Sequence, residues 1–496
     1  MFLPIGEFAP DQMAAGYQGA TVAKNCVPST KDGYGPFPSL VTLTTALTAT
    51  CQGAIAVRAN DGNVYIFAGD ATKLYQLSGS TWTDVSKAGG YSTPSDGAWF
   101  FVQIGNRIVA TNYFDAIQTF VIGVSSLFAD LSASAPKARY VAVVRGALVV
   151  ASTNDGVDGE VQNRVWWPDV SDPTSWPTIG SAAAAAAQSD YNDIAYGGGI
   201  FGILGGVGGR DGVVWLQNAI VVMTYSGPPT VFSFQDAERG RGTTIAGSII
   251  NAGLFAAYIG EDGFYLFNGV SSVAIGSQKV DVFFWDGANQ LTLNLIRSAV
   301  HPKRKLLLWS YATGSSTTPD RILIFNWELG RWSYADASTE IIVSGYTSGF
   351  DLDTDSSYAN DTNLDSTAPG LDSTAFMGGR VLMGGFDSNH KFGFFDGDTL
   401  TATMETGEPL NSTGRRYEVD GILPVTDAAT KTAAVGYRDD LDDAITYTTA
   451  TSPQADRFCP QRIETPLPRV RITIAAAQSW THCKGAVLRM NEGSER

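Results

Sequence analysis

The sequence predicts an all-β protein: a β-propeller with an extended N-terminal arm and a C-terminal β-sandwich-like region. Short runs of alternating aromatic and aliphatic residues recur along the chain, each after a turn signal, and helical periodicity is almost absent. The composition includes 54 glycines and 11% aromatic residues but only 17% charged residues. A disordered chain has the opposite balance, so the composition indicates a folded, turn-rich protein.

Residues 1–48 are rich in proline, glycine and single aromatic residues, as in "GYGPFPSL" at residues 33–40. Proline and glycine fix turns and interrupt regular elements, so we expect an extended N-terminal arm. An arm of this kind either ties the domain to a neighbouring subunit or supplies a strand that closes the propeller. The sequence leaves both alternatives open.

Residues 49–350 are predicted to form the β-propeller. In "NDGNVYIFAGD" (residues 60–70) and "EDGFYLFNG" (residues 261–269), an Asp-Gly turn precedes residues that alternate with the period of a β-strand. Such hairpins recur roughly every 40–50 residues, which is the spacing expected of four-stranded propeller blades. The run "SAAAAAAQ" (residues 181–188) is either one short helix or a flexible insertion.

Tryptophans are numerous in this predicted propeller. We expect most of them to fill the spaces between blades, because buried aromatic rings dominate such cores. The functional alternative is a platform on which carbohydrate rings stack. The tryptophans concerned are Trp82, Trp166, Trp167, Trp176, Trp215, Trp309, Trp327 and Trp332.

Residues 351–376 form an acidic, polar stretch, and residues 377–496 resume the strand pattern. Asp351, Asp353 and Asp355 imitate the start of a calcium-binding loop. However, Ser356 replaces the expected glycine and Thr362 replaces the bidentate glutamate, so we expect a solvated loop. The C-terminal residues are expected to form a last blade, a β-sandwich, or both.

The net charge is −16, from 33 Lys and Arg against 49 Asp and Glu. This balance argues against a sequence-reading DNA-binding protein, but not against a channel through which a polyanion passes.

The four cysteines form no CxxC pair and the three histidines are far apart, so we expect buried thiols, no metal and no cofactor. The N-terminal residues do not resemble a signal peptide and no apolar run is long enough to span a membrane.

No catalytic motif was found, and the sequence therefore predicts that the protein is not an enzyme. The segment "STNDGVDG" (residues 152–159) resembles a sialidase Asp-box turn only loosely. The chain has no G-x-S-x-G elbow, no H-E-x-x-H and no P-loop. With 49 acidic residues, no pair of carboxylates can be selected as a glycosidase site.

Basic residues gather in a few segments. Arg239 and Arg241 lie in "ERGRG", and Lys303, Arg304 and Lys305 lie in the predicted hairpin turn "PKRK". These five are candidates for contacts with phosphates in a channel or with acidic patches of neighbouring subunits. The structural alternative is ordinary solvated turns. The same two alternatives apply to the C-terminal arginines Arg415, Arg416, Arg457, Arg462, Arg469 and Arg471.

Several segments, in their order along the chain, resemble segments of a known protein family. They include "NCVPSTKDGYGPFPSL", "NRVWWPDVSDPTSW", "GRGTTIAGSIINAGLFAAYIGEDGFYLFNG", "HPKRKLLLWSY" and "RVRITIAAAQSWTHCKGAVLRM". Over nearly its whole length the chain resembles structural proteins of tailed-bacteriophage tails, namely the tail nozzle (tail tubular) and head-completion proteins of short-tailed phages.

The resemblance implies a homo-oligomeric, hexameric ring below the portal and adaptor rings of a virion tail, synthesised in the host cytoplasm. The ring would retain packaged double-stranded DNA, conduct it during ejection without sequence specificity, and dock tail fibres or other tail proteins. Three alternatives remain: a receptor-binding tail-fibre adhesin that binds host glycans, a polysaccharide-degrading propeller enzyme, and a cellular interaction propeller.

Overall fold

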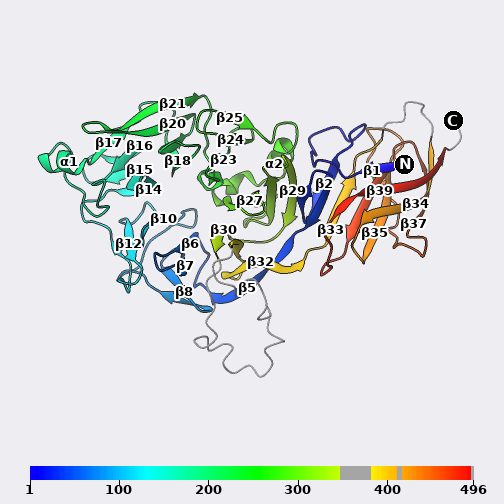
Figure 1. Ribbon diagram of the computed structural model, residues 1–496, viewed down its shortest axis with the longest axis horizontal. Helices are drawn as coiled ribbons and strands as arrows, with labels where there is room; N and C mark the ends of the chain where they lie inside the picture. Colours follow the sequence, from blue (N-terminus) through cyan, green and yellow to red (C-terminus); the bar gives the residue numbers. More distant parts are fainter. Residues whose placement is uncertain (347–380, 410–415, 493–496) are drawn as a thin grey trace, which may run out of the picture.

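The computed structural model describes residues 1–346, 381–409 and 416–492. These residues are mostly β-strand, and the molecule is elongated, with four-stranded sheets at one end and the C-terminal strands at the other (Figure 1). The prediction of an all-β fold with propeller-like blades is therefore confirmed at this level. The predicted acidic loop at 351–376, with Asp351, Asp353 and Asp355, lies outside the described residues.

The blades are antiparallel sheets of four strands, and in all but the last the strands are hydrogen-bonded in chain order. Within the described ranges there are seven, six as separate sheets and one as part of a larger sheet. They consist of β6 (Gly53–Arg58), β7 (Val64–Gly69), β8 (Leu74–Ser78) and β9 (Thr81–Asp84); β10 (Phe100–Ile104), β11 (Arg107–Thr111), β12 (Gln118–Val121) and β13 (Ala129–Asp130); β14 (Lys137–Val144), β15 (Ala147–Asp155), β16 (Gly159–Trp167) and β17 (Asp190–Asp193); β18 (Ile200–Gly205), β19 (Gly212–Leu216), β20 (Ala219–Gly227) and β21 (Val231–Arg239); β22 (Ile250–Asn251), β23 (Ala256–Ile259), β24 (Phe264–Phe267) and β25 (Ser272–Ala274); β26 (Arg297–His301), β27 (Leu306–Tyr311), β28 (Arg321–Asn326) and β29 (Arg331–Asp336); and β30 (Ile341–Tyr346), β31 (Val381–Phe386), β32 (Lys391–Thr399) and β5 (Pro38–Ala46).

The first strands of most neighbouring blades lie against one another, and β30 of the last blade contacts β6 of the first. Their approach is close: a Cβ on Gly205 of β18 would lie 1.8 Å from the carbonyl oxygen of Val143 in β14. Only glycine allows two backbones to come so near. The inner strands therefore define an axis around which the blades are arranged (Figure 1).

The predicted Asp-Gly hairpin at the start of the chain's first blade is present. Gly62 has a φ of +90° in the turn between β6 and β7, a backbone conformation that glycine adopts without strain. We call the side with this turn, between the first and second strand of each blade, face 1. The connections from one blade to the next lie on the opposite side, face 2, because the strands alternate in direction.

Most of the tryptophans fill the core, as predicted. Trp167, Trp215, Trp309 and Trp332 are at most 1% exposed and Trp176 is buried, whereas Trp82, Trp166 and Trp327 are partly exposed.

The alanine run is a short helix, α1 (Ala182–Ala187), whose first turn is capped by the Ser181 side chain. The other helices are α2 (Asp281–Gly287) and the 3-10 turns η1 (Ala246–Ser248) and η2 (Gln290–Leu295).

The N-terminal segment runs through both ends of the molecule. Its strands are β1 (Phe2–Pro4), β2 (Ala20–Lys24), β3 (Cys26–Thr30) and β4 (Gly33–Pro36), followed by β5. Strand β1 pairs with the C-terminal strand β39, and β5 completes a blade by pairing with β32. The second alternative for the arm, a strand that completes the blades, is thus realised within the chain.

A single nine-stranded sheet connects the blades to the C-terminal strands. In it, β2 lies between β29 of a blade and β33 of the C-terminal region. The C-terminal strands are β33 (Ala402–Thr406), β34 (Tyr417–Thr426), β35 (Lys431–Tyr437), β36 (Thr446–Tyr447), β37 (Cys459–Thr465), β38 (Arg469–Ile474) and β39 (Cys483–Glu492). A second, six-stranded sheet contains β3, β4, β39, β34 and β37, with β1 paired to β39. One hydrophobic core contains side chains of both C-terminal sheets and of adjoining blade strands.

Arg331, at the start of β29, fixes the N-terminal segment to this blade. Its guanidinium is buried and donates to the carbonyl oxygens of Thr30 (2.8 Å), Lys31, Ile5 (3.3 Å) and Gly6.

The four cysteines are free and buried, as expected. No helix in the described parts of the chain is long and apolar enough to cross a membrane.

Candidate functional site

Arg239 and Arg241, at the end of β21 near face 2, have acidic partners three residues earlier. Arg239 is 2.5 Å from Asp236, and Arg241 is 3.7 Å from Glu238. Each guanidinium also lies over an aromatic ring, 4.5 Å from its centre. These two predicted contact residues are therefore largely neutralised by their own strand.

Lys303, Arg304 and Lys305 occupy the turn between β26 and β27 on face 1, opposite to Arg239 and Arg241. No ion pair joins these three to a carboxylate among the described residues. Burial, together with the charges of Arg304 and Lys303, lowers the pKa of His301 beneath the turn to about 4. The structure does not bring the two predicted basic segments together, and their role in a channel or subunit interface stays a prediction.

Of the C-terminal arginines singled out in the sequence, Arg469 and Arg471 belong to a network with Arg438, Glu405 and Glu408, which we call the charged network. Arg416 pairs with Asp439, and Arg415 lies outside the described residues. Arg438 and Arg469 lie 2.6 Å and 3.1 Å from the Glu408 carboxylate, and Arg471 lies 2.5 Å from that of Glu405. The two glutamates are at most 4% exposed. Arg469 and Arg471 therefore serve the packing of β33 against β38.

The Asp-box-like turn is also held by an internal arginine. The Arg164 side chain is 4% exposed, 2.6 Å from Asp158 and 2.7 Å from Asp193. Its guanidinium lies 3.8 Å from the centre of the Tyr191 ring. The resemblance to a sialidase turn therefore reflects a structural salt bridge between β16 and β17.

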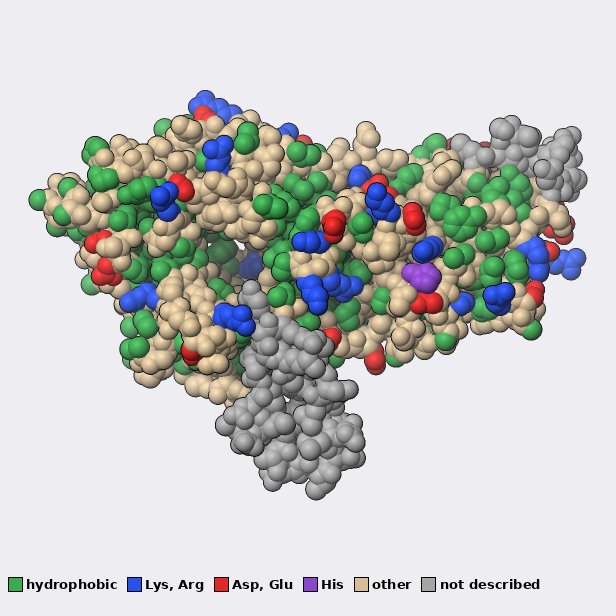
Figure 2. Space-filling model, in the orientation of Figure 1, with side chains coloured by type: hydrophobic (Ala, Val, Ile, Leu, Met, Phe, Trp, Pro, Cys, Tyr) green, Lys and Arg blue, Asp and Glu red, His purple; other side chains and the backbone are tan. Residues whose placement is uncertain are grey.

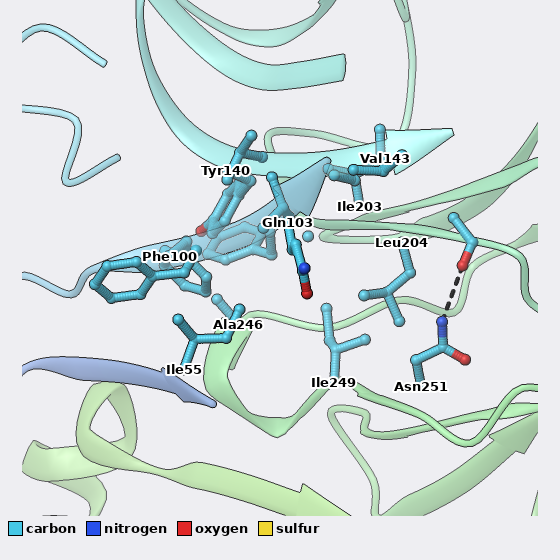
Figure 3. A pocket seen from close by; sticks show the side chains of 17 residues that line it. Ile55, Phe100, Gln103, Tyr140, Val143, Ile203, Leu204, Ala246, Ile249 and Asn251 are labelled. Atoms are coloured by element: carbon cyan, nitrogen blue, oxygen red, sulfur yellow. Dashed lines mark hydrogen bonds between the residues drawn. The ribbon is translucent and has the colours of Figure 1, made fainter. Parts of the chain in front are cut away.

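A cavity of about 400 Å³, the axial cavity, is lined by the first strands of five blades (Figure 3). Its walls are apolar, with Ile55, Phe100, Tyr140, Ile203 and Ile249 pointing inward. Gln103 also points into it, and its amide donates to the carbonyl oxygens of Arg58 and Gly105. Asn251 closes one side by donating to the Gly205 carbonyl oxygen at 2.9 Å.

A second cavity, of about 310 Å³, opens at the face 2 ends of the inner strands. We call it the Arg297 cavity, because Arg297, the first residue of β26, lines it. Its wall consists of the link between β5 and β6, the start of β30 and the segment before β28. The lining residues are Ala49, Thr50, Cys51, Gln52, Ala71, Ser95, Gly97, Leu295, Arg297, Thr317, Thr318, Pro319, Glu340 and Ile341.

Arg297 is held in place by backbone carbonyls alone. One terminal nitrogen, Nη1, donates to the carbonyl oxygens of Asn294 (2.7 Å) and Ile296 (2.9 Å). No carboxylate forms an ion pair with it in the part of the chain that the structure describes. Burial lowers the pKa of Arg297 to about 10.

Glu340 lies on the same wall but is engaged elsewhere. One carboxylate oxygen accepts from the backbone N–H of Cys51 at 2.8 Å, and the other contacts His390. Burial raises the pKa of Glu340 above its ordinary value.

No group of three or more His, Cys, Asp or Glu residues in the described ranges could hold a metal ion.

Sequence reasoning did not single out Arg297, Gln52 or the axial cavity. The signal available was weak: in "NLIRSAV" one arginine stands among apolar residues at the start of a strand. The arrangement of the blades decides which strands begin at the same cavity. The sequence alone does not give this arrangement.

No family model and no curated protein sequence matches the chain. Among the solved structures that are similar to it are two named "putative 6-phosphogluconolactonase". The protein from Bacteroides fragilis is 13% identical, with a TM-score of 0.37, and the match covers 63% of this chain and 98% of that one. The protein from Bacteroides uniformis is 12% identical, with a TM-score of 0.36, and the match covers 57% and 86%.

These neighbours correct one prediction. The chain was expected not to be an enzyme, but the similar structures carry the name of an enzyme, so that exclusion does not stand. The absence of a sequence motif was too weak a reason, because an active site can be assembled from residues far apart in the sequence. At this level of similarity the neighbours assign no activity to this chain, and they do not test the resemblance to phage tail proteins.

Proposed function

We propose that this protein is a structural subunit of a short-tailed phage tail, forming a homohexameric ring, the nozzle or tail tube, below the portal and adaptor rings. In this proposal the blades close into a β-propeller and the C-terminal sheets form a β-sandwich. The assembled ring retains packaged DNA and conducts it during ejection, and other tail proteins or fibres dock on its outside.

The nine-stranded sheet is the observation that carries this proposal. It joins a blade to the C-terminal strands through β2, which pairs with β29 at Lys24 and Tyr334 and with β33 along most of its length. The N-terminal segment adds strands at both ends, and Arg331 fastens it in the middle. An elongated subunit whose two ends share one sheet is suited to a ring that must keep its shape under the pressure of packaged DNA.

Surface composition also supports an assembling subunit. Several large apolar side chains are more than half exposed, including Leu254, Val270 and Val273 of the β22–β25 blade. Exposed apolar groups of this kind are commonly covered by a partner. On the face in Figure 2, Lys and Arg occur in small groups among other side chains, without a continuous basic stripe. An acidic protein of this type would not hold DNA tightly as it passes.

The DNA channel of the proposed ring lies between subunits. The axial cavity of one subunit, at about 400 Å³, has the size of a small-molecule pocket and apolar walls. A head-to-tail interface that closes after a full rotation produces a central opening from the surfaces of several subunits. Lys303, Arg304 and Lys305 are the described cations that we assign to contacts with DNA or an adjacent subunit.

A second candidate function, glycan binding by a tail adhesin, is favoured by one groove. It has a volume of about 830 Å³ and is lined by Trp166, Trp176 and Tyr191 together with Asp155 and Asp158. Aromatic rings beside carboxylates are common in carbohydrate sites. However, the Trp166 ring already packs against Trp176 and Tyr191, which limits the face it can offer to a sugar.

The test is electron cryomicroscopy of virions from the phage that encodes this chain, with native mass spectrometry of the purified protein. We expect six copies in a ring at the top of the tail. Three copies in a peripheral fibre, with binding on a glycan array, would favour the adhesin. Absence of the chain from purified virions would refute the proposal.

A further inference from the structure

We propose that the Arg297 cavity is a binding site for a small molecule that carries both an oxyanion, phosphate or carboxylate, and a hydroxyl group. This inference is independent of the tail function proposed above. It depends on two groups on the cavity wall whose bonding capacity the protein leaves unused.

The first group is the Arg297 guanidinium. A guanidinium has five N–H donors, and the bonds to Asn294 and Ile296 use only one of its nitrogens. Nε and Nη2 remain, and together they form the edge that binds a phosphate or carboxylate through two parallel hydrogen bonds. An oxyanion in the cavity would therefore supply the counter-charge that the described protein groups do not.

The second group is the side-chain carbonyl of Gln52, which is a hydrogen-bond acceptor. Gln52 is 7% exposed, and its Nε2 donates to the carbonyl oxygen of Pro94 at 2.6 Å, which fixes the orientation of the amide. Its Oε1 has no donor within the described chain. A buried acceptor without a donor costs free energy, and a ligand hydroxyl would satisfy it.

The remaining wall limits the size and character of the ligand. A volume of about 310 Å³ is at the lower end of the range for small-molecule pockets. Thr317 and Thr318 add hydroxyl groups, and Leu295 and Ile341 add apolar surface. Glu340 would repel an anion placed beside it, but its oxygens face the Cys51 N–H and His390. The oxyanion is therefore placed against Arg297 and the hydroxyl end against Gln52.

Isothermal titration calorimetry on the full chain tests this site with glycerol 3-phosphate, lactate and inorganic phosphate as probes, and with glycerol as the uncharged control. We expect glycerol 3-phosphate or lactate to bind, inorganic phosphate to bind more weakly, and glycerol to show no binding. The two organic probes distinguish a phosphate from a carboxylate as the preferred oxyanion.

Three variants locate the binding. Arg297→Met should weaken binding of the preferred probe by about tenfold or more, and Arg297→Lys should give an intermediate affinity because lysine keeps the charge but not the fork. Arg239→Ala, which removes an exposed and already paired arginine, should leave the affinity unchanged. Equal binding to the wild type and Arg297→Met, or no binding of any anionic probe, would overturn the proposal. Thermal unfolding of each variant confirms that it is folded.

Discussion

The charged network and the Arg297 cavity hold arginines in opposite ways. In the charged network, Arg438 and Arg469 lie within 3.1 Å of Glu408, and the carboxylates and guanidinium groups neutralise one another. In the cavity, Arg297 contacts only backbone carbonyls, and its guanidinium keeps an unused edge. Arg469 is buried and has its counter-charge inside the protein, whereas Arg297 is partly buried and has no carboxylate partner in the described chain.

This difference separates residues that hold the fold from residues that are free to bind. A buried ion pair with full partners contributes to one arrangement of strands, and removal of either member leaves an unpaired charge behind. A buried cation without a partner adds a solvation cost that the rest of the fold must offset. Removal of such a cation should therefore affect ligand binding more than stability.

The largest expected effect is in the charged network. Arg469→Met removes the guanidinium between Glu405 and Glu408 and should lower the free energy of unfolding by about 3–5 kcal/mol, because two buried carboxylates lose a neutralising partner. Urea unfolding monitored by tryptophan fluorescence measures this change. A loss below about 1 kcal/mol would mean that the network is dispensable and that the contrast with Arg297 is false.

An intermediate effect is expected for His301 on acidification. Its pKa is about 4 in the folded protein and about 6.5 when unfolded. The unfolded chain therefore binds the proton first, so the stability contributed by neutral His301 is complete above pH 6.5. It is lost as the pH falls to 4, by up to about 3 kcal/mol at 1.36 kcal/mol per pKa unit.

The variant His301→Gln isolates this contribution, since glutamine stays neutral throughout. The difference in unfolding free energy between the wild type and the variant should shrink or change sign between pH 7 and pH 4.5. A difference that is constant over this range would show that His301 titrates with an ordinary pKa. The Lys303–Lys305 turn would then exert no field on it.

A smaller effect is expected for Arg297→Met without ligand. The variant loses two hydrogen bonds to carbonyls but also removes a poorly solvated charge, and it leaves no carboxylate unpaired. We expect the free energy of unfolding to change by no more than about 1 kcal/mol. Urea unfolding beside Arg469→Met makes a direct comparison, and similar losses in the two variants would contradict the distinction drawn above.

The same contrast explains what could be predicted from the sequence. Strand alternation and Asp-Gly turns are local, so the blades, the Gly62 hairpin and the burial of Trp215 and Trp309 followed from short segments. The partners of Arg469 and the neighbours of Arg297 are set by pairings between distant strands, such as β33 with β38. No local pattern encodes those contacts. The basic segments that stood out by charge density lie in a turn and at a strand end, and their role in a channel or a subunit interface stays a prediction.

The smallest effect is expected for Arg239→Ala. Its side chain is 69% exposed and its partner, Asp236, is three residues away on the same strand, so salt and water screen the pair. We expect the free energy of unfolding to change by less than about 0.5 kcal/mol. Thermal and urea unfolding of this variant measure the change, and Lys303→Ala on face 1 provides the matched control for a cation that has no carboxylate partner in the described chain. If Arg239 contacts DNA or an adjacent subunit, its loss would instead reduce ring formation or DNA retention in virions while stability stays the same. That result would show that Arg239 serves binding and does not serve the stability of the fold.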